Sequence, residues 1–181
     1  PMTHLGRVVM TAVAAAAVAV IPAAPAHARA ACAGASALPQ QSRLAKVRAA
    51  TLCLINAERR ERGLPPLRAD RRLSRAATRH SQRMVRLRFF DHVGPRGLTM
   101  AQRVEAAGYT GWRRLGENIA WGSGSRSAPA RIVADWMRSP GHRRTILDAR
   151  LREIGIGVAR GAPQPVGGLP AATYTTNFGA R

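Results

Sequence analysis

A change in hydrophobic period along the chain constrains its fold more than any other feature. Apolar residues recur at helical spacing over 44–55, before a charged run and a glycine stop. Near the C-terminus the period becomes two, over residues 154–158 and 173–178, which flank a Gly/Pro-rich loop. This alternation predicts an antiparallel hairpin, with residues 115–121 as a third strand. Helices first and strands last indicate an α+β layered domain.

Side chains that can cap free backbone N–H groups mark the starts of the later helices. Asp70 precedes a helix whose apolar stripe includes His80, so we expect this histidine to face the core. A Ser-Pro pair, typical of a helix start, places His142 in the first turn of a short helix. The helix starts predicted in this way are Asp70, Thr99, Ser127 and Ser139.

The N-terminal part of the chain is typical of an exported protein. In residues 1–28, Arg7 precedes an Ala/Val run that ends in small residues, which predicts a secretory signal peptide. A signal anchor is the alternative, but prolines and small alanines make the segment marginal for a membrane span of about 20 apolar residues. Residues 29–42 lack periodicity and are expected to form a flexible arm. Residues 43–181 are then one domain.

The two cysteines lie beyond the predicted cleavage point. Cys32 falls in the arm and Cys53 in the first predicted helix. An oxidising exterior favours a disulfide between them, which would contribute about 3 kcal/mol, mostly by restricting the unfolded chain. Two free buried thiols are the alternative.

The formal net charge of +20 comes almost wholly from arginine, because Lys46 is the only lysine. A surface of this kind attracts polyanions. Export favours anionic lipids or acidic cell-wall polymers as partners, and we expect no nucleic acid. The alternative is that the composition reflects a biased base composition of the gene, with no partner selected.

Three polar blocks supply groups able to bind a metal or move a proton: His92, Glu117 and His142. Two imidazoles and a carboxylate are sufficient to bind Zn²⁺ or another divalent cation with one open position. The same three residues are the catalytic candidates, with a histidine as general base. Purely structural hydrogen bonding is the third alternative. At a helix N-terminus, His142 is expected to have a lowered pKa.

Other chemistry has less support in the sequence. No serine lies in a G-x-S-x-G elbow, and the Gly-Ser run at 122–125 lacks the lysine of a phosphate-binding loop. Gly155 and Gly157, inside a predicted strand, permit close approach of another backbone or a ligand. A groove lined by Tyr109, Trp121 and Tyr174 would accept a small apolar ligand such as an acyl chain or sterol.

Several blocks in a fixed order resemble the bacterial secreted branch of the CAP superfamily. This family comprises cysteine-rich secretory proteins, antigen 5 and plant pathogenesis-related 1 proteins, and is also called SCP-like. The match covers about residues 44–180, and the combination of blocks is highly specific. The blocks are Leu54–Arg59, Ala77–Met84, Phe90–His92, Gly116–Ala120, Trp136–Leu147 and Tyr174–Gly179.

The resemblance implies a three-layer α-β-α sandwich around a small, mostly antiparallel sheet. It also implies a cleft where the family places two histidines and two acidic residues, sometimes with zinc. His92 matches the first histidine and Glu117 the glutamate of the G-E-N motif, while His142 resembles the second histidine through the bacterial S-P-G-H-R block. Ser139 stands where the family often has its second glutamate, and Glu153 is at best a substitute.

The resemblance does not settle an activity. We expect a secreted, monomeric binding module with a basic surface for anionic cell-envelope material and a His/Glu cleft for a divalent cation or small ligand. One alternative is a metal- or water-dependent hydrolase of peptides or esters that uses His92, His142 and Glu117. Another is a stable extracellular interaction domain without chemistry in the cleft.

Overall fold

The computed structural model describes residues 32–181 as an α+β domain with five α-helices and four β-strands. The predicted hairpin and the predicted third strand are both present. Two short 3₁₀ turns complete the regular structure, at Pro95–Gly97 and Gly124–Ser127. In chain order the elements are α2 (Leu44–Arg60), β1 (Arg68–Ala69), α3 (Arg71–Leu87), α4 (Met100–Ala106), β2 (Arg114–Ser123), α5 (Pro129–Arg138), α6 (Pro140–Ile146), β3 (Glu153–Arg160) and β4 (Ala171–Ala180).

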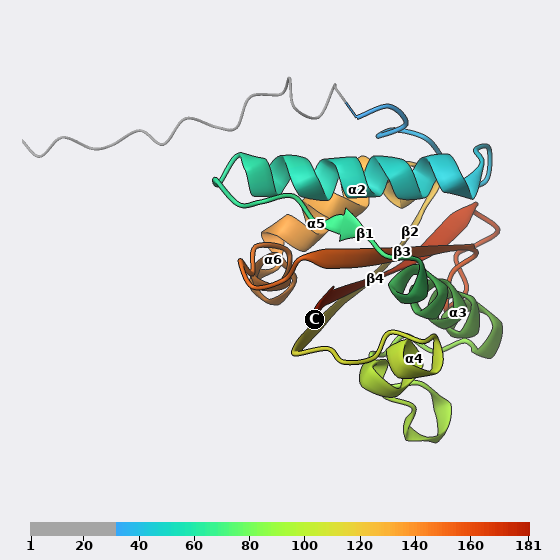
Figure 1. The fold of residues 1–181 in the computed structure, drawn as a ribbon. Helices are drawn as coiled ribbons and strands as arrows, with labels where there is room; N and C mark the ends of the chain where they lie inside the picture. The colour runs from blue at the N-terminus through green and yellow to red at the C-terminus, as the bar shows by residue number, and fades with distance from the viewer. Residues whose placement is uncertain (1–31) are drawn as a thin grey trace, which may run out of the picture.

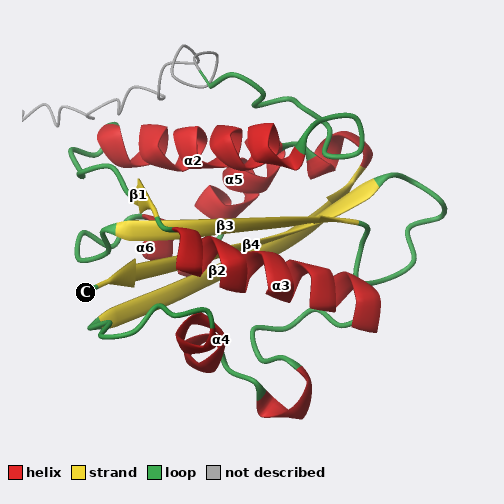
Figure 2. Ribbon diagram, turned by 45° about the vertical axis from the view of Figure 1, so that its right-hand side comes forward, coloured by secondary structure: helices red, strands yellow, loops and turns green. Residues whose placement is uncertain are grey.

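These elements stack in three layers (Figure 1, Figure 2). Helices α2, α5 and α6 lie on one face of the sheet, and α3 and α4 lie on the other. The larger hydrophobic core fills the first interface and includes Leu54, Trp136 and Phe178. A smaller core, around Leu73 and Tyr109, fills the second. The expected α-β-α sandwich is therefore confirmed.

The sheet has the strand order β1-β3-β4-β2. Strand β4 pairs antiparallel with β3 on one side and with β2 on the other, so the sheet is mostly antiparallel as expected. The two-residue strand β1 pairs parallel with the start of β3. Because β1 has only two residues, it is too short to show alternation and could not be predicted from the sequence.

The backbones of α3 and β3 touch at two glycines. A Cβ atom added to Gly155 would lie 2.0 Å from the carbonyl carbon of Leu73, and one added to Gly157 would lie 2.2 Å from that of Ala77. Real Cβ contacts are never this short. The two glycines therefore serve the first of their expected roles, the close approach of another backbone, and they set the depth of α3 on the sheet.

Adding a methyl group at this contact should push the two layers apart. We expect Gly157→Ala to lower the free energy of unfolding by at least about 2 kcal/mol, because overpacking cannot be relieved between two backbones. Gly141→Ala is the matched control, since no atom lies within 4 Å of its added Cβ. Urea unfolding measures both, and an unchanged stability for Gly157→Ala would contradict the contact.

Two of the predicted caps form and two do not. The Asp70 side chain accepts hydrogen bonds from the backbone of Arg72 and Leu73, and Thr99 forms a capping box at the start of α4. The start predicted at Ser127 is wrong, because α5 begins at Pro129. Ser127 instead closes the preceding 3₁₀ turn, with its hydroxyl donating to Gly124 O at 2.7 Å. Ser139 precedes α6 but makes no side-chain capping bond.

A disulfide joins Cys32 to Cys53, with 5.7 Å between their Cα atoms. This bond confirms the pairing that export favours over two free thiols. The segment 32–42, expected to be a flexible arm, forms turns, and the carbonyl oxygen of Ala35 accepts a bond from Ala130 N at 2.9 Å.

The predicted signal peptide, residues 1–28, lies outside the described residues. Between residues 32 and 181 no helix is long and apolar enough to cross a membrane.

Candidate functional site

Glu117 is the centre of the candidate site, with a side chain that is 3 % exposed. It lies on β2 opposite Asn177 of β4. His92 Nδ1 donates to its Oε1 at 2.9 Å, and Arg103 Nη2 donates to its Oε2 at 2.6 Å. The Asn177 amide, in the orientation that satisfies both of its ends, also donates to Oε2, at 2.9 Å. Both carboxylate oxygens are therefore occupied.

Arg103 is the site residue that sequence reasoning missed. Its side chain is 2 % exposed although it carries a permanent charge. Besides Glu117, it bonds the carbonyl oxygens of His92 and Leu98, each at 2.9 Å, and so fixes the loop between α3 and α4. The only signal was its position next to Val104 on the buried side of a short helix, one arginine among 29 basic residues.

His80 of α3 also holds the loop between α3 and α4. As predicted it faces the core, with no exposed surface, and its Nε2 donates to Asp91 O at 3.0 Å. The other ring nitrogen, Nδ1, is buried without a partner. Burial, and then the positive charge of Arg103, lower the pKa of His80 to about 4. His80 is therefore a neutral donor that positions the residue before His92.

His92 itself is half-exposed, with 51 % of its side-chain surface accessible. The hydrogen bond from its Nδ1 to Glu117 raises the pKa of His92, because the carboxylate stabilises the imidazolium. A histidine held by a buried carboxylate through one nitrogen leaves the other nitrogen available. The pair can bind a small polar ligand or act as a general base.

His142 approaches from the other face of the sheet. Asn118 follows Glu117 on β2, so its side chain points to the opposite face of the sheet. Its amide donates to His142 O at 3.1 Å and holds the first turn of α6. Burial, followed by the charge of His92, lowers the pKa of His142. The lowering is in the expected direction, and its causes are burial and the charge of a neighbouring imidazole. Although the imidazoles interact through charge, His142 forms no hydrogen bond to His92 or Glu117 in the described chain.

The position of α6 depends on a buried arginine of α2. Arg59 has no exposed surface, and its guanidinium donates to Ile146 O at 2.7 Å and to Asp148 O at 3.1 Å. A third bond reaches Leu151 O at 3.4 Å. Because these carbonyls belong to the last residue of α6 and to the segment that follows it, Arg59 anchors the end of the helix that carries His142.

The zinc site predicted at His92, Glu117 and His142 stays a prediction, and one feature of the structure opposes a metal ion at the carboxylate. Arg103 places a permanent positive charge against the one carboxylate, which opposes a divalent cation at that oxygen. His142 does not reach the His92–Glu117 pair by a hydrogen bond. Within the described range 32–181, no three His, Cys, Asp or Glu side chains form a group able to hold a metal ion.

Other residues singled out in the sequence lie elsewhere. Glu153 accepts a bond from Tyr109 Oη at 2.7 Å and pairs with Arg181, so it does not substitute for a second cleft acid. Tyr109 and Tyr174 have no exposed surface and belong to different cores on opposite faces of the sheet, with Tyr174 donating to Ser127 O. The groove predicted between these tyrosines and Trp121 is therefore wrong.

Comparison with known proteins agrees with this fold and these blocks. The family model of the CAP or cysteine-rich secretory protein family matches residues 52–176. The chain therefore belongs to the CAP family.

Three of the similar proteins are bacterial and longer than this chain. The uncharacterized protein YkwD of Bacillus subtilis is 38 % identical over 104 residues, which cover 58 % of this chain and 39 % of YkwD. An extracellular SCP-domain protein of Bacillus anthracis superposes with a TM-score of 0.62 at 25 % identity, over 77 % of this chain and 44 % of that one. A cysteine-rich secretory protein of Staphylococcus aureus gives 0.56 at 15 % identity, over 76 % and 39 %. The chain spans less than half of each.

The buried His80 should make stability depend on acid. Because its pKa is about 4 when folded and near 6.5 when unfolded, the unfolded chain takes up the proton first as pH falls. We expect stability to drop between pH 6.5 and 4, by at most about 3 kcal/mol from this residue. His92 has the opposite sign, since its raised pKa adds stability below pH 6.5 that is lost as pH rises through its folded pKa.

Comparing urea unfolding of the wild type and His80→Gln across this range isolates the His80 contribution. Glutamine can still donate to Asp91 O but does not titrate. An unchanged pH slope in the variant would show that His80 is not the group responsible.

Removing the charge of Arg103 should strengthen the binding of a metal ion at Glu117. We expect Arg103→Met to bind Zn²⁺ at least about tenfold more tightly than the wild type, because Glu117 is freed and the repelling cation is gone. Calorimetry measures the affinity, and zinc should raise the melting temperature of the variant but not of the wild type. If the wild type binds zinc more tightly than Arg103→Met does, and His92→Ala loses this binding, Arg103 does not oppose the metal and the predicted zinc site is supported.

Proposed function

We propose that this chain is an exported CAP-domain binding module that binds phosphate-bearing anionic lipid of the cell envelope. The proposed contact surface is the end of α3 together with the loop that follows it. The proposal rests on a hollow of about 470 Å³ at this position. The hollow is lined by Arg83, Arg86, Leu87, Pro95, Arg96 and Leu98.

The three arginines of this hollow have no carboxylate partner. None of Arg83, Arg86 and Arg96 forms an ion pair with any residue from 32 to 181. Guanidinium groups bind phosphate oxygens through paired N–H donors. A concave site with three unpaired arginines is therefore complementary to a phosphate group.

Exposed apolar residues beside the hollow favour a lipid surface over a soluble polymer. Leu87, Phe90 and Val93 are 49 %, 45 % and 47 % exposed, and they belong to the same short segment. Apolar side chains flanked by cations can enter the interface of an anionic bilayer while the cations contact head groups. A wall polymer would leave these three side chains in water.

Export is supported by three observations. The Cys32–Cys53 disulfide is typical of an oxidising compartment. The solved Bacillus anthracis relative is described as extracellular. Residues 1–28 carry the sequence pattern of a secretory signal.

The His92–Glu117 pair supports a small-ligand site as a second part of this function. Its half-exposed ring can bind a polar group, with Glu117 holding the ring in place. A hydrolase is the second candidate, favoured by the same pair because a carboxylate-oriented histidine can activate water. No hydroxyl or thiol of residues 32–181 bonds to His92, so water would be the nucleophile.

Vesicle binding tests the lipid proposal. We expect the purified protein to sediment with phosphatidylglycerol-containing vesicles at low salt and to be released at high salt. The double variant Arg83→Gln/Arg86→Gln should bind at least about tenfold more weakly. The matched control Arg131→Gln/Arg144→Gln removes the same charge from exposed positions on α5 and α6 and should bind almost as the wild type does.

A further variant separates lipid from polymer. Phe90→Ser should weaken binding to vesicles and leave binding to purified wall fragments unchanged. Equal loss in both double variants would mean that only net charge matters, and absence of vesicle binding at low salt would refute the proposal.

A further inference from the structure

The sheet of this protein ends on one side at an incompletely covered strand. Strand β1 covers only the start of β3, where Arg68 N donates to Arg152 O at 2.9 Å and Asp70 N donates to Ile154 O at 2.8 Å. The chain then turns away, because Asp70 caps α3. In the described chain no strand follows β1 along the rest of β3.

The backbone groups on this open edge belong to Ile156 and Val158. The bond from Gly161 N to Ala171 O shows that odd-numbered residues here face β4, whereas the carbonyls of Arg152 and Ile154 face β1. Alternation along the strand therefore turns Ile156 and Val158 to the open side. No group from residue 32 to 181 bonds to their N–H or C=O on that side. Both residues are nevertheless buried, at 5 % and 1 % exposed, so the side chains that line this edge must move aside before a new strand can pair there.

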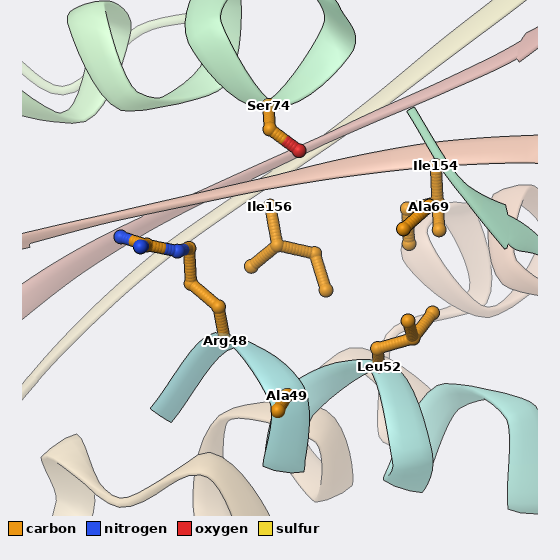
Figure 3. Close-up of a pocket in the computed structure, with 7 residues that line it drawn as sticks. All are labelled: Arg48, Ala49, Leu52, Ala69, Ser74, Ile154 and Ile156. Atoms are coloured by element: carbon orange, nitrogen blue, oxygen red, sulfur yellow. The ribbon is translucent and has the colours of Figure 1, made fainter. Parts of the chain in front are cut away.

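A pocket lies where β1 would continue, between α2 and α3 (Figure 3). Its volume is about 260 Å³ and its walls are mostly apolar. Figure 3 shows Arg48 and Ser74 on its two sides, with Ile156 between them. A second hollow, of about 370 Å³, reaches Val158 farther along the same strand. The residues lining the first pocket are Arg48, Ala49, Leu52, Ala69, Ser74, Ile154 and Ile156.

The mouth of this pocket is strongly basic. Arg48 and Ser74 also line an adjoining hollow whose other walls include Arg71, Arg75 and Arg79. None of these four arginines forms an ion pair with any residue of the described chain. Any occupant of the pocket therefore meets uncompensated positive charge at its exposed side.

We propose that the open edge of β3 binds an extended acidic peptide segment of a partner protein, which adds as a strand in continuation of β1. Strand addition satisfies the free N–H and C=O groups of Ile156 and Val158. Alternate side chains of the added strand enter the apolar pocket or face the arginines. A hydrocarbon chain would fill the pocket but leave these backbone groups without partners. This function is independent of the lipid contact proposed above, because the arginines at the mouth of the pocket do not line the hollow of the lipid contact.

The probe is a hexapeptide that alternates valine and glutamate, acetylated and amidated at its ends, added to the ¹⁵N-labelled protein. We expect the amide signals of Ile156 and Val158 to shift and their hydrogen exchange to slow. Arg48→Glu should weaken the affinity at least about tenfold, whereas the control Arg131→Glu, with the same charge change on α5, should alter it less than about twofold. Ala49→Phe should abolish binding by filling the pocket.

Four results would overturn the proposal. The first is no change in the two amide signals at about 1 mM peptide, which corresponds to roughly −4 kcal/mol of binding. The second is equal binding of a peptide N-methylated at alternate positions, which cannot form the ladder. The third is equal loss in Arg48→Glu and Arg131→Glu. The fourth is equal protection of the two amides by anionic vesicles, which would assign the edge to lipid.

Discussion

The contact between α3 and β3, backbone against backbone at Gly155 and Gly157, is the constraint on which the rest of the arrangement depends. It sets the depth of α3, and α3 carries His80, whose ring holds the carbonyl just before His92. The antiparallel register then aligns Gly155, Asn177 and Glu117 in one row across the sheet. A shift of α3 would therefore move the histidine relative to the carboxylate that holds it.

Charge compensation inside the domain explains why a chain rich in arginine can bury Glu117. A carboxylate and a guanidinium in direct contact form a pair with no net charge, and Arg103 Nη1 donates to two backbone carbonyls. The buried Nε of Arg103 has no partner among the described residues. Arg59 follows the same rule with carbonyls alone. In both cases the buried arginine bonds to backbone carbonyls of a segment that connects two elements, and so fixes that segment. Several exposed or partly exposed arginines, in contrast, including Arg83, Arg86 and Arg96, form no ion pair with any residue from 32 to 181.

The periodic elements could be predicted from the sequence. The choice of His92 and Glu117 as site residues could be predicted as well, and their side chains are in direct contact. The helix from Asp70 and the strands with Gly155 and Gly157 carry strong local signals, because period and caps act within a few residues. Arg103 could not be singled out, because its burial depends on contacts with a loop and a strand remote in sequence. The helix start predicted at Ser127 was wrong for the opposite, local reason. The Ser127 hydroxyl bonds to Gly124 O within the preceding turn, and the helix starts later, at Pro129. The short strand β1 exists only because β3 provides its partners.

The single lysine of the chain has a practical consequence. Lys46 is exposed on the first turns of α2, and α2 covers the opposite face of the sheet from α3. A reagent that couples to amines would therefore find one side chain of this domain, Lys46, besides the N-terminal amine. The guanidinium-rich faces would stay unmodified, so a dye or a surface attached in this way would leave them accessible to solution.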